Sequence, residues 1–234
     1  MKMLPASDWV SGVLAPAVGL WLRSQLDHVD HLQIQITSKN QQLLRGKISQ
    51  VDLKADQAVY QGIHLSHGEM TATNIEINVG EMLKGKPFRL LAPVPVIGSV
   101  ALTVGDLQAS FGSKLLAQGL EEAIAQIIPP ASGLQLGSIR WETANFQPDA
   151  IELQGQMADV HGQRGITLHS GLAMATPQTL RLAPLQLTLG ATAHALPAFK
   201  LDLGPDIQLT LLDLTPNAIR LEGCLTIIPE PPSP

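Results

Sequence analysis

The feature that most constrains the fold is a short pattern, Leu-x-Gly-x-apolar-x-x-Val, which the chain contains twice. It covers Leu44–Val51 and recurs at Leu153–Val160. Two further patterns follow each copy in the same order: Gly62–Gly68 matches Gly165–Gly171, and Leu102–Leu107 matches Leu209–Leu214. Three ordered matches at nearly constant spacing indicate an internal duplication. We therefore predict a single domain over residues 1–234, built from two similar helix-plus-strands units at about residues 5–112 and 113–228.

Most of each unit alternates apolar and polar residues with a period of two, which is typical of half-buried β-strands. The segment Leu32–Ile36 is the clearest case. In the first copy the apolar positions change from even to odd numbers between Ile48 and Val51. One extra residue near Ser49–Gln50, a β-bulge, would restore the apolar face and bend the strand. Because the second copy shows the same change, we expect curved sheets.

Two segments instead show helical spacing. The first covers residues 9–22 and contains Pro16, which should kink it. The second covers residues 115–128, with Ser113 as its N-cap and prolines at its end. The fold class that we predict is α+β, with highly curved, mostly antiparallel sheets wrapped on two helices. The proline-rich residues 229–234 should form a disordered tail.

The composition points to surplus apolar surface. The chain is 45% hydrophobic but only 3% aromatic and 15% charged, against about 25% charged in a typical domain. Two helices, each covering about 10 Å of sheet width, cannot cover so many aliphatic strand positions. We therefore predict an apolar slot between helix and concave sheet that suits acyl chains. The residues expected to line it are Val13, Ala17, Leu20, Trp21, Leu83, Phe88, Leu90, Val96, Phe111, Leu116, Leu120 and Ile124.

A basic and apolar segment, residues 83–91, is the second candidate surface. Lys84, Lys86 and Arg89 alternate there with large apolar residues. One interpretation is an ordinary connecting loop with a solvated basic edge. The other places these three cations, together with Trp9, at a membrane, where each cation near an anionic surface contributes about 1 kcal/mol.

Several functions are disfavoured. A net charge of −5 without a basic block argues against nucleic acid as a partner. A single cysteine, Cys224, excludes an internal disulfide and a cysteine-based zinc site. Neither a nucleophile elbow nor a phosphate-binding glycine loop is present, and the histidines lack ligand spacing, so we expect no enzyme, no metal and no cofactor. The apolar stretch Trp9–Leu22 is too short to span a bilayer and lacks the charge of a signal peptide, which predicts a cytoplasmic or peripheral membrane protein.

Four stretches resemble the LmeA-like phospholipid-binding family, in its cyanobacterial-type branch: Leu44–Gly46, Val59–Ile63, Lys84–Pro87 and Leu102–Leu107. The resemblance covers roughly residues 5–228. It implies a fold similar to tubular lipid-binding domains, in which a highly curved antiparallel sheet wraps a long helix around an acyl-chain cavity. Actinobacterial relatives are envelope proteins with export signals, and this chain departs from them by lacking a convincing one. The family supplies no catalytic residues.

Three functions stay open. The first is non-enzymatic binding and transfer of a phospholipid or other acyl lipid in a hydrophobic groove, with peripheral docking on a membrane surface. The second is a membrane-associated structural or scaffold protein whose slot is filled by its own side chains. The third is an enzyme that acts on lipids with the help of the histidines. The sequence leaves the oligomeric state open.

Overall fold

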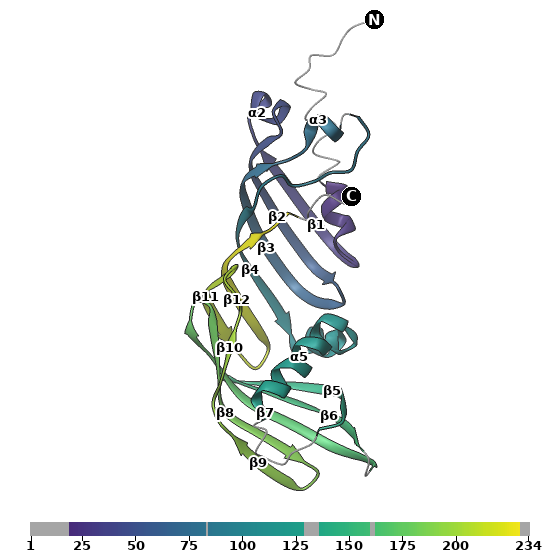
Figure 1. Ribbon diagram of the computed structural model, residues 1–234, viewed down its shortest axis with the longest axis vertical. Coiled ribbons are helices and arrows are strands. Elements are labelled where there is room, and N and C mark those ends of the chain that lie inside the picture. The colour runs from purple at the N-terminus through teal and green to yellow at the C-terminus, as the bar shows by residue number, and fades with distance from the viewer. Residues whose placement is uncertain (1–18, 83, 129–135, 160–161, 230–234) are drawn as a thin grey trace, which may run out of the picture.

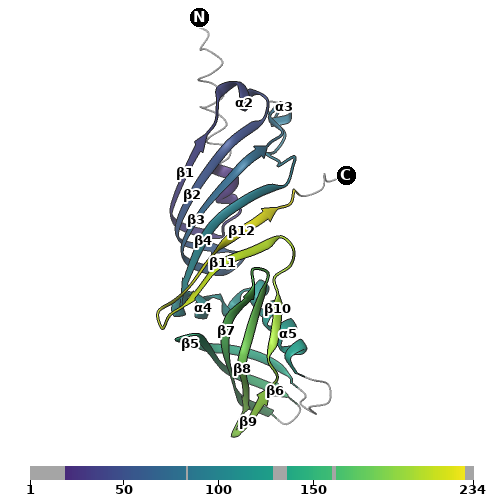
Figure 2. The ribbon, with the colours of Figure 1, turned by 90° about the vertical axis from the view of Figure 1, so that its left-hand side faces the viewer.

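The computed structural model describes residues 19–82, 84–128, 136–159 and 162–229. Two antiparallel sheets follow one another along the long axis of the molecule (Figures 1 and 2). The first has the order β1-β2-β3-β4-β12-β11. Its strands are β1 (His28–Thr37), β2 (Lys47–Tyr60), β3 (Ile63–Glu76), β4 (Val94–Thr103), β11 (Ile207–Leu214) and β12 (Ala218–Ile227).

The second sheet has the order β10-β8-β7-β6-β5, and β9 also pairs with β8. Its strands are β5 (Ser138–Gln147), β6 (Ala150–Asp159), β7 (Gly162–Thr176), β8 (Thr179–Leu189), β9 (Thr192–Leu196) and β10 (Phe199–Asp202). The helices are short: residues 19–24, α2 (Asn40–Leu44), α3 (Val79–Met82), α4 (Val104–Ala109), the 3₁₀ turn Ser110–Gly112 and α5 (Lys114–Ile127). The predicted α+β class with mostly antiparallel strands is confirmed.

The chain crosses between the two sheets twice. It leaves the first sheet after β4, builds the second sheet through β10, and then returns, so that β12 pairs with β4. The hairpin of β11 and β12 belongs to the second predicted unit by sequence and to the first sheet by pairing. The division between the sheets therefore does not coincide with the predicted boundary at residue 112, and the internal duplication itself stays a prediction.

The β-bulge predicted near residues 49–50 is wrong. Strands β2 and β3 pair through this point in a continuous register, without an extra residue on either strand. Opposite Ser49 lies Asn74, which adopts a left-handed backbone with φ of 53°, a conformation that asparagine tolerates better than most residues. Ile48 and Val51 both lie in one buried cluster. The buried face thus does change parity here, at a left-handed residue in the partner strand.

In the second copy the irregularity also lies in a partner strand. Strand β6 pairs with β7 in a continuous register, and Val160 lies outside the described residues. The extra residue is in β5, whose register with β6 shifts between Trp141 and Thr143. Gly155 of β6 faces this bulge, and a Cβ added there would lie 2.2 Å from the carbonyl oxygen of Arg140. The glycine of the repeated pattern therefore permits a close approach of two backbones.

Buried side chains form three clusters. The first lies against the first sheet and includes Ile48, Val51, Ile75, Ile77, Val94 and Val96. The second lies between α5 and the second sheet and includes Ile127, Leu153, Met157, Ile166, Leu168 and Leu187. The third, made of Phe146, Leu214 and Ile219, joins β5 to the β11–β12 hairpin. This third cluster packs one sheet on the other.

Serine hydroxyls fix α5 relative to the first sheet. As predicted, Ser113 is the N-cap of α5: its Oγ accepts a hydrogen bond from the Leu116 N–H at 3.3 Å. The same hydroxyl donates to the carbonyl of Gln61 at 2.8 Å. Just before it, the Ser110 Oγ accepts from the His64 N–H at 2.8 Å. Gln61 lies in the turn between β2 and β3 and His64 lies at the start of β3, so the start of α5 is tied to the end of the first sheet.

Candidate functional site

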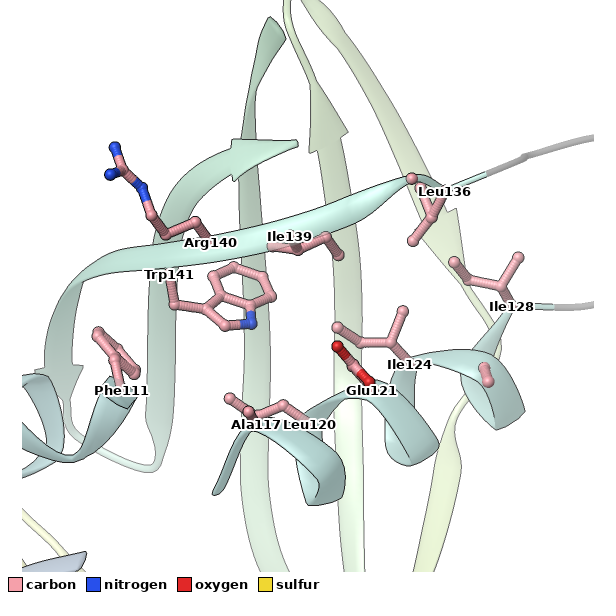
Figure 3. Close-up of a pocket in the computed structure, with 12 residues that line it drawn as sticks. Phe111, Ala117, Leu120, Glu121, Ile124, Ile128, Leu136, Ile139, Arg140 and Trp141 are labelled. Atoms are coloured by element: carbon pink, nitrogen blue, oxygen red, sulfur yellow. The ribbon is translucent and has the colours of Figure 1, made fainter. Parts of the chain in front are cut away.

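A cavity of about 600 Å³ lies between α5 and β5 (Figure 3). Its volume falls within the range of roughly 300–1,000 Å³ that is usual for small-molecule sites. The lining residues come from the 3₁₀ turn, from α5 and the residue after it, and from β5 and the two residues before it. They are Phe111, Ala117, Leu120, Glu121, Ile124, Ala125, Ile128, Leu136, Gly137, Ile139, Arg140 and Trp141.

Most side chains that line this cavity are apolar. Trp141 points from β5 toward α5, where Leu120 and Ile124 face it (Figure 3). Among the described lining residues the charged ones are Glu121 and Arg140. Arg140 points to the other side of the strand (Figure 3), and its guanidinium forms an ion pair with Glu142. The cavity can therefore accommodate an apolar chain, beside the carboxylate of Glu121 that α5 contributes to the lining.

A basic loop lies at the other end of the molecule, after α3 (Figure 1). Asn78, only 5% exposed, holds it: its Nδ2 donates to the carbonyl of Pro87 at 2.9 Å, and its Oδ1 accepts from the Arg89 N–H at 2.8 Å. Lys86 donates to Glu81 at 2.9 Å. The hydrogen bond from Lys86, and after it a hydrogen bond from the Asn78 side chain to the same carboxylate, lower the pKa of Glu81. The loop is thus ordered by one buried amide.

The described part of the chain lacks two features that would point to other functional classes. It holds no group of three or more His, Cys, Asp or Glu side chains that could bind a metal ion. None of its helices has the length and apolar character needed to cross a membrane. The α5–β5 cavity is a candidate site for binding an apolar ligand.

The family model for LmeA-like phospholipid-binding proteins matches residues 6–224. This is nearly the whole chain of 234 residues. The chain belongs to the LmeA-like phospholipid-binding family. Comparison with the curated proteins and with the solved structures gave no significant match.

The residues that the sequence suggested for lipid contact fall in separate places of this LmeA-like chain. Phe111, Leu120 and Ile124 line the α5–β5 cavity. Leu116 is half-buried on α5 but does not line the cavity. Val13, Ala17, Leu83 and the suggested membrane residue Trp9 lie outside the described residues.

The remaining suggested residues lie at the first sheet. Val96 is 3% exposed within the first buried cluster, and Phe88 and Leu90 pack against that cluster. The rings of Trp21 and Phe88 contact each other, with centroids 4.7 Å apart. Leu20, on the same helical segment as Trp21, is 69% exposed. The first sheet thus carries a contact between two suggested residues, and the second carries the cavity.

The sequence reasoning missed the β5 side of the cavity. Ile139 and Trp141 alternate in β5 and face α5, and their spacing of two marks them as residues of one strand face. Nothing in the sequence shows which helix that face meets. Ala117 was also missed, because a small residue on a helix carries little apolar signal of its own.

Proposed function

We propose that the protein binds a phospholipid, or another acyl lipid, without chemical turnover and transfers it between membranes. The observation that supports this most is the α5–β5 cavity, which is lined mainly by aliphatic and aromatic side chains and lies in a member of a phospholipid-binding family. An acyl chain would lie between Leu120 and Ile124 on one side and Trp141 on the other. The headgroup would remain outside, where polar groups meet water.

The energy available from such a site is sufficient. Burying apolar surface yields about 0.8 kcal/mol per methylene group, so a chain of about sixteen carbons gains at most on the order of 12 kcal/mol. Loss of rotational and translational freedom reduces this gain by several kcal/mol. Useful affinity is left even without an ion pair to the headgroup.

The wider architecture in this proposal is a tubular lipid-binding one, with curved sheets enclosing apolar space. Transfer also requires contact with a membrane. The residues that we propose for this contact are Trp9, Lys84, Lys86 and Arg89. The described cations of this set are exposed or half-exposed, which supports access to a lipid surface.

Lipid occupancy is the decisive measurement. Native mass spectrometry of the gently purified protein should show a bound lipid, and Ala117→Trp, which fills the cavity, should remove it. Gln118→Trp places the same side chain on an exposed neighbouring position of α5 that does not line the cavity, so it should retain the lipid. A wild-type protein that carries no lipid and takes up no labelled phospholipid would refute the proposal.

A second candidate, a membrane-associated scaffold without a ligand, is favoured by the first sheet. There Leu22, Met82, Phe88 and Leu90 pack against the buried cluster, so this part of the apolar interior is filled by the chain itself. If the protein is such a scaffold, it should float with liposomes and show no bound lipid in the mass spectrum. Retention of lipid by the wild type and its loss in Ala117→Trp would exclude it.

A further inference from the structure

The end of the first sheet that carries α2 and α3 forms a compact surface. We call it the basic tip and define it as residues 38–47 and 76–91, apart from Leu83, which is not described. Figures 1 and 2 both show α2 and α3 together at this end of the long axis. Backbone hydrogen bonds join the two segments. The Ile77 N–H donates to the Gly46 carbonyl at 2.8 Å, and Lys47 of β2 lies opposite Glu76 of β3 in the strand register.

The charge of the basic tip is opposite to that of the chain. Its six cationic side chains are Lys39, Arg45, Lys47, Lys84, Lys86 and Arg89, and its two carboxylates are Glu76 and Glu81. The local charge is therefore +4, although the chain as a whole carries −5. The remainder of the molecule is correspondingly acidic, so the protein is polarised along its length.

Four of these six cations form no ion pair within the described part of the chain, although Arg89 lies near enough to Glu81 to help lower the pKa of that carboxyl. Lys47 pairs with Glu76 at 3.0 Å and Lys86 pairs with Glu81 at 2.9 Å. The four that lack an ion pair there, which we call the unpaired cations, are Lys39, Arg45, Lys84 and Arg89. A surface that keeps four cations outside any ion pair is suited to an anion of larger extent than one carboxylate.

Two large aliphatic side chains are exposed at the same end. Leu44, the last residue of α2, is 50% exposed, and Leu91, which follows the basic loop, is 59% exposed. Exposed leucines among cations are characteristic of surfaces that combine electrostatic attraction with shallow burial in a bilayer. A soluble polyanion would use the cations and leave the leucines in water.

We propose that the basic tip is a docking surface for an anionic lipid bilayer. The unpaired cations lie against the headgroup phosphates, and Leu44 and Leu91 insert below them. This deepens the membrane contact of the proposed function and rests on it, but it adds α2 as a second half of the surface. The α5–β5 cavity then lies toward the end of the molecule that points away from the bilayer (Figure 1).

Vesicle co-sedimentation tests the proposal with the full chain. The wild type should bind phosphatidylcholine vesicles that contain phosphatidylglycerol, and should bind pure phosphatidylcholine far more weakly. Raising the salt from about 0.1 M to about 1 M shortens the screening length from ~10 Å to ~3 Å and should release it. The double variant Arg45→Gln with Lys84→Gln should weaken binding by about fivefold per cation, or about 25-fold together.

The matched control removes two cations elsewhere. Arg181 and Lys200 are exposed and paired across β8 and β10 in the second sheet, so changing both to Gln alters the net charge equally and should leave vesicle binding near the wild-type value. Leu44→Ser keeps the charge and should weaken binding about tenfold, because the leucine contributes only when it enters the bilayer. Thermal melts of all variants verify that each remains folded.

Three outcomes would overturn the proposal. The first is that the control double variant loses as much vesicle binding as Arg45→Gln with Lys84→Gln. The second is that the protein binds vesicles with and without phosphatidylglycerol equally. The third is that it binds soluble polyphosphate as strongly as vesicles and that Leu44→Ser has no effect. Loss of lipid from the α5–β5 cavity can be distinguished from loss of membrane docking. Ala117→Trp should dock normally but carry no lipid, whereas the basic-tip variants should carry lipid and fail to dock.

Discussion

Replacing Asn78 with leucine should destabilise the fold and release the basic loop. Leucine has the same branched arrangement of side-chain heavy atoms as asparagine, with two larger methyl groups in place of the amide oxygen and nitrogen, so the change removes hydrogen bonds without leaving a cavity. It leaves two backbone groups without partners: the carbonyl of Pro87, at 2.9 Å from the asparagine Nδ2, and the N–H of Arg89, at 2.8 Å from its Oδ1. The side chain is only 5% exposed, so water cannot replace it directly.

The size of this effect follows from the two unpaired groups. A buried polar group that loses its partner costs about 1–3 kcal/mol. Because the loop itself is half-exposed and can relax toward water, we expect a total near the lower part of the range, about 2–4 kcal/mol for both groups. A domain has a free energy of unfolding of only about 5–15 kcal/mol, so the loss should be visible as a clear fall in the urea midpoint.

Urea unfolding followed by far-ultraviolet circular dichroism measures this loss. Limited trypsin digestion reports on the loop, which should be cut more rapidly after Lys84 and Arg89. Asn145→Leu is the control, because Asn145 is exposed on β5 and its replacement should change the free energy of unfolding by less than about 0.5 kcal/mol. An Asn78→Leu protein as stable as that control, with unchanged digestion at the loop, would refute the reasoning.

Three further predictions concern other parts of the structure. Gly46→Ala should lower the free energy of unfolding, measured with urea, by at least about 2 kcal/mol, because φ is +75° and the added Cβ would lie 2.3 Å from a carbonyl oxygen. Gly119→Ala in α5 is the control: its Cβ would meet nothing within 4 Å, so it should stabilise the protein by up to about 1 kcal/mol. Equal effects of the two changes would contradict this prediction. Met157→Ala, at a fully buried position of the second core, should lower the free energy of unfolding by about 2–5 kcal/mol, and a loss below about 1 kcal/mol would show that the site collapses readily. The hydrogen bond from His67 to Asp56 at 2.6 Å raises the pKa of the histidine. The stability that this hydrogen bond contributes is therefore complete below the unfolded pKa of about 6.5 and is lost as the pH rises through the folded value. An NMR titration in which Asp56→Asn fails to lower the His67 pKa would contradict the assignment.

The sequence determined the local elements and the family. Alternation over Leu32–Ile36 predicted β1, where these residues are half-buried and their neighbours exposed. The serine at 113 predicted the start of α5. Both signals are local, because a strand face repeats every two residues and a helix cap depends on one side chain and the next turn. For the same reason the α+β class could be stated from the chain alone.

Only the tertiary structure decided how these elements are combined. The β11–β12 hairpin has the same alternation as the strands before it, yet it pairs with β4 of the first sheet, because the choice of partner depends on packing between residues distant in sequence. The parity change in the first repeated pattern was visible in Ile48 and Val51, but only the structure shows that a left-handed residue of the paired strand lies opposite it. The cavity likewise required α5 and β5 to meet, and the basic tip required residues about forty positions apart to come together at one end of a sheet. The periodicity of the sequence shows which face of a helix or strand is apolar. Only the packing of helices and strands in the folded chain shows what that face contacts.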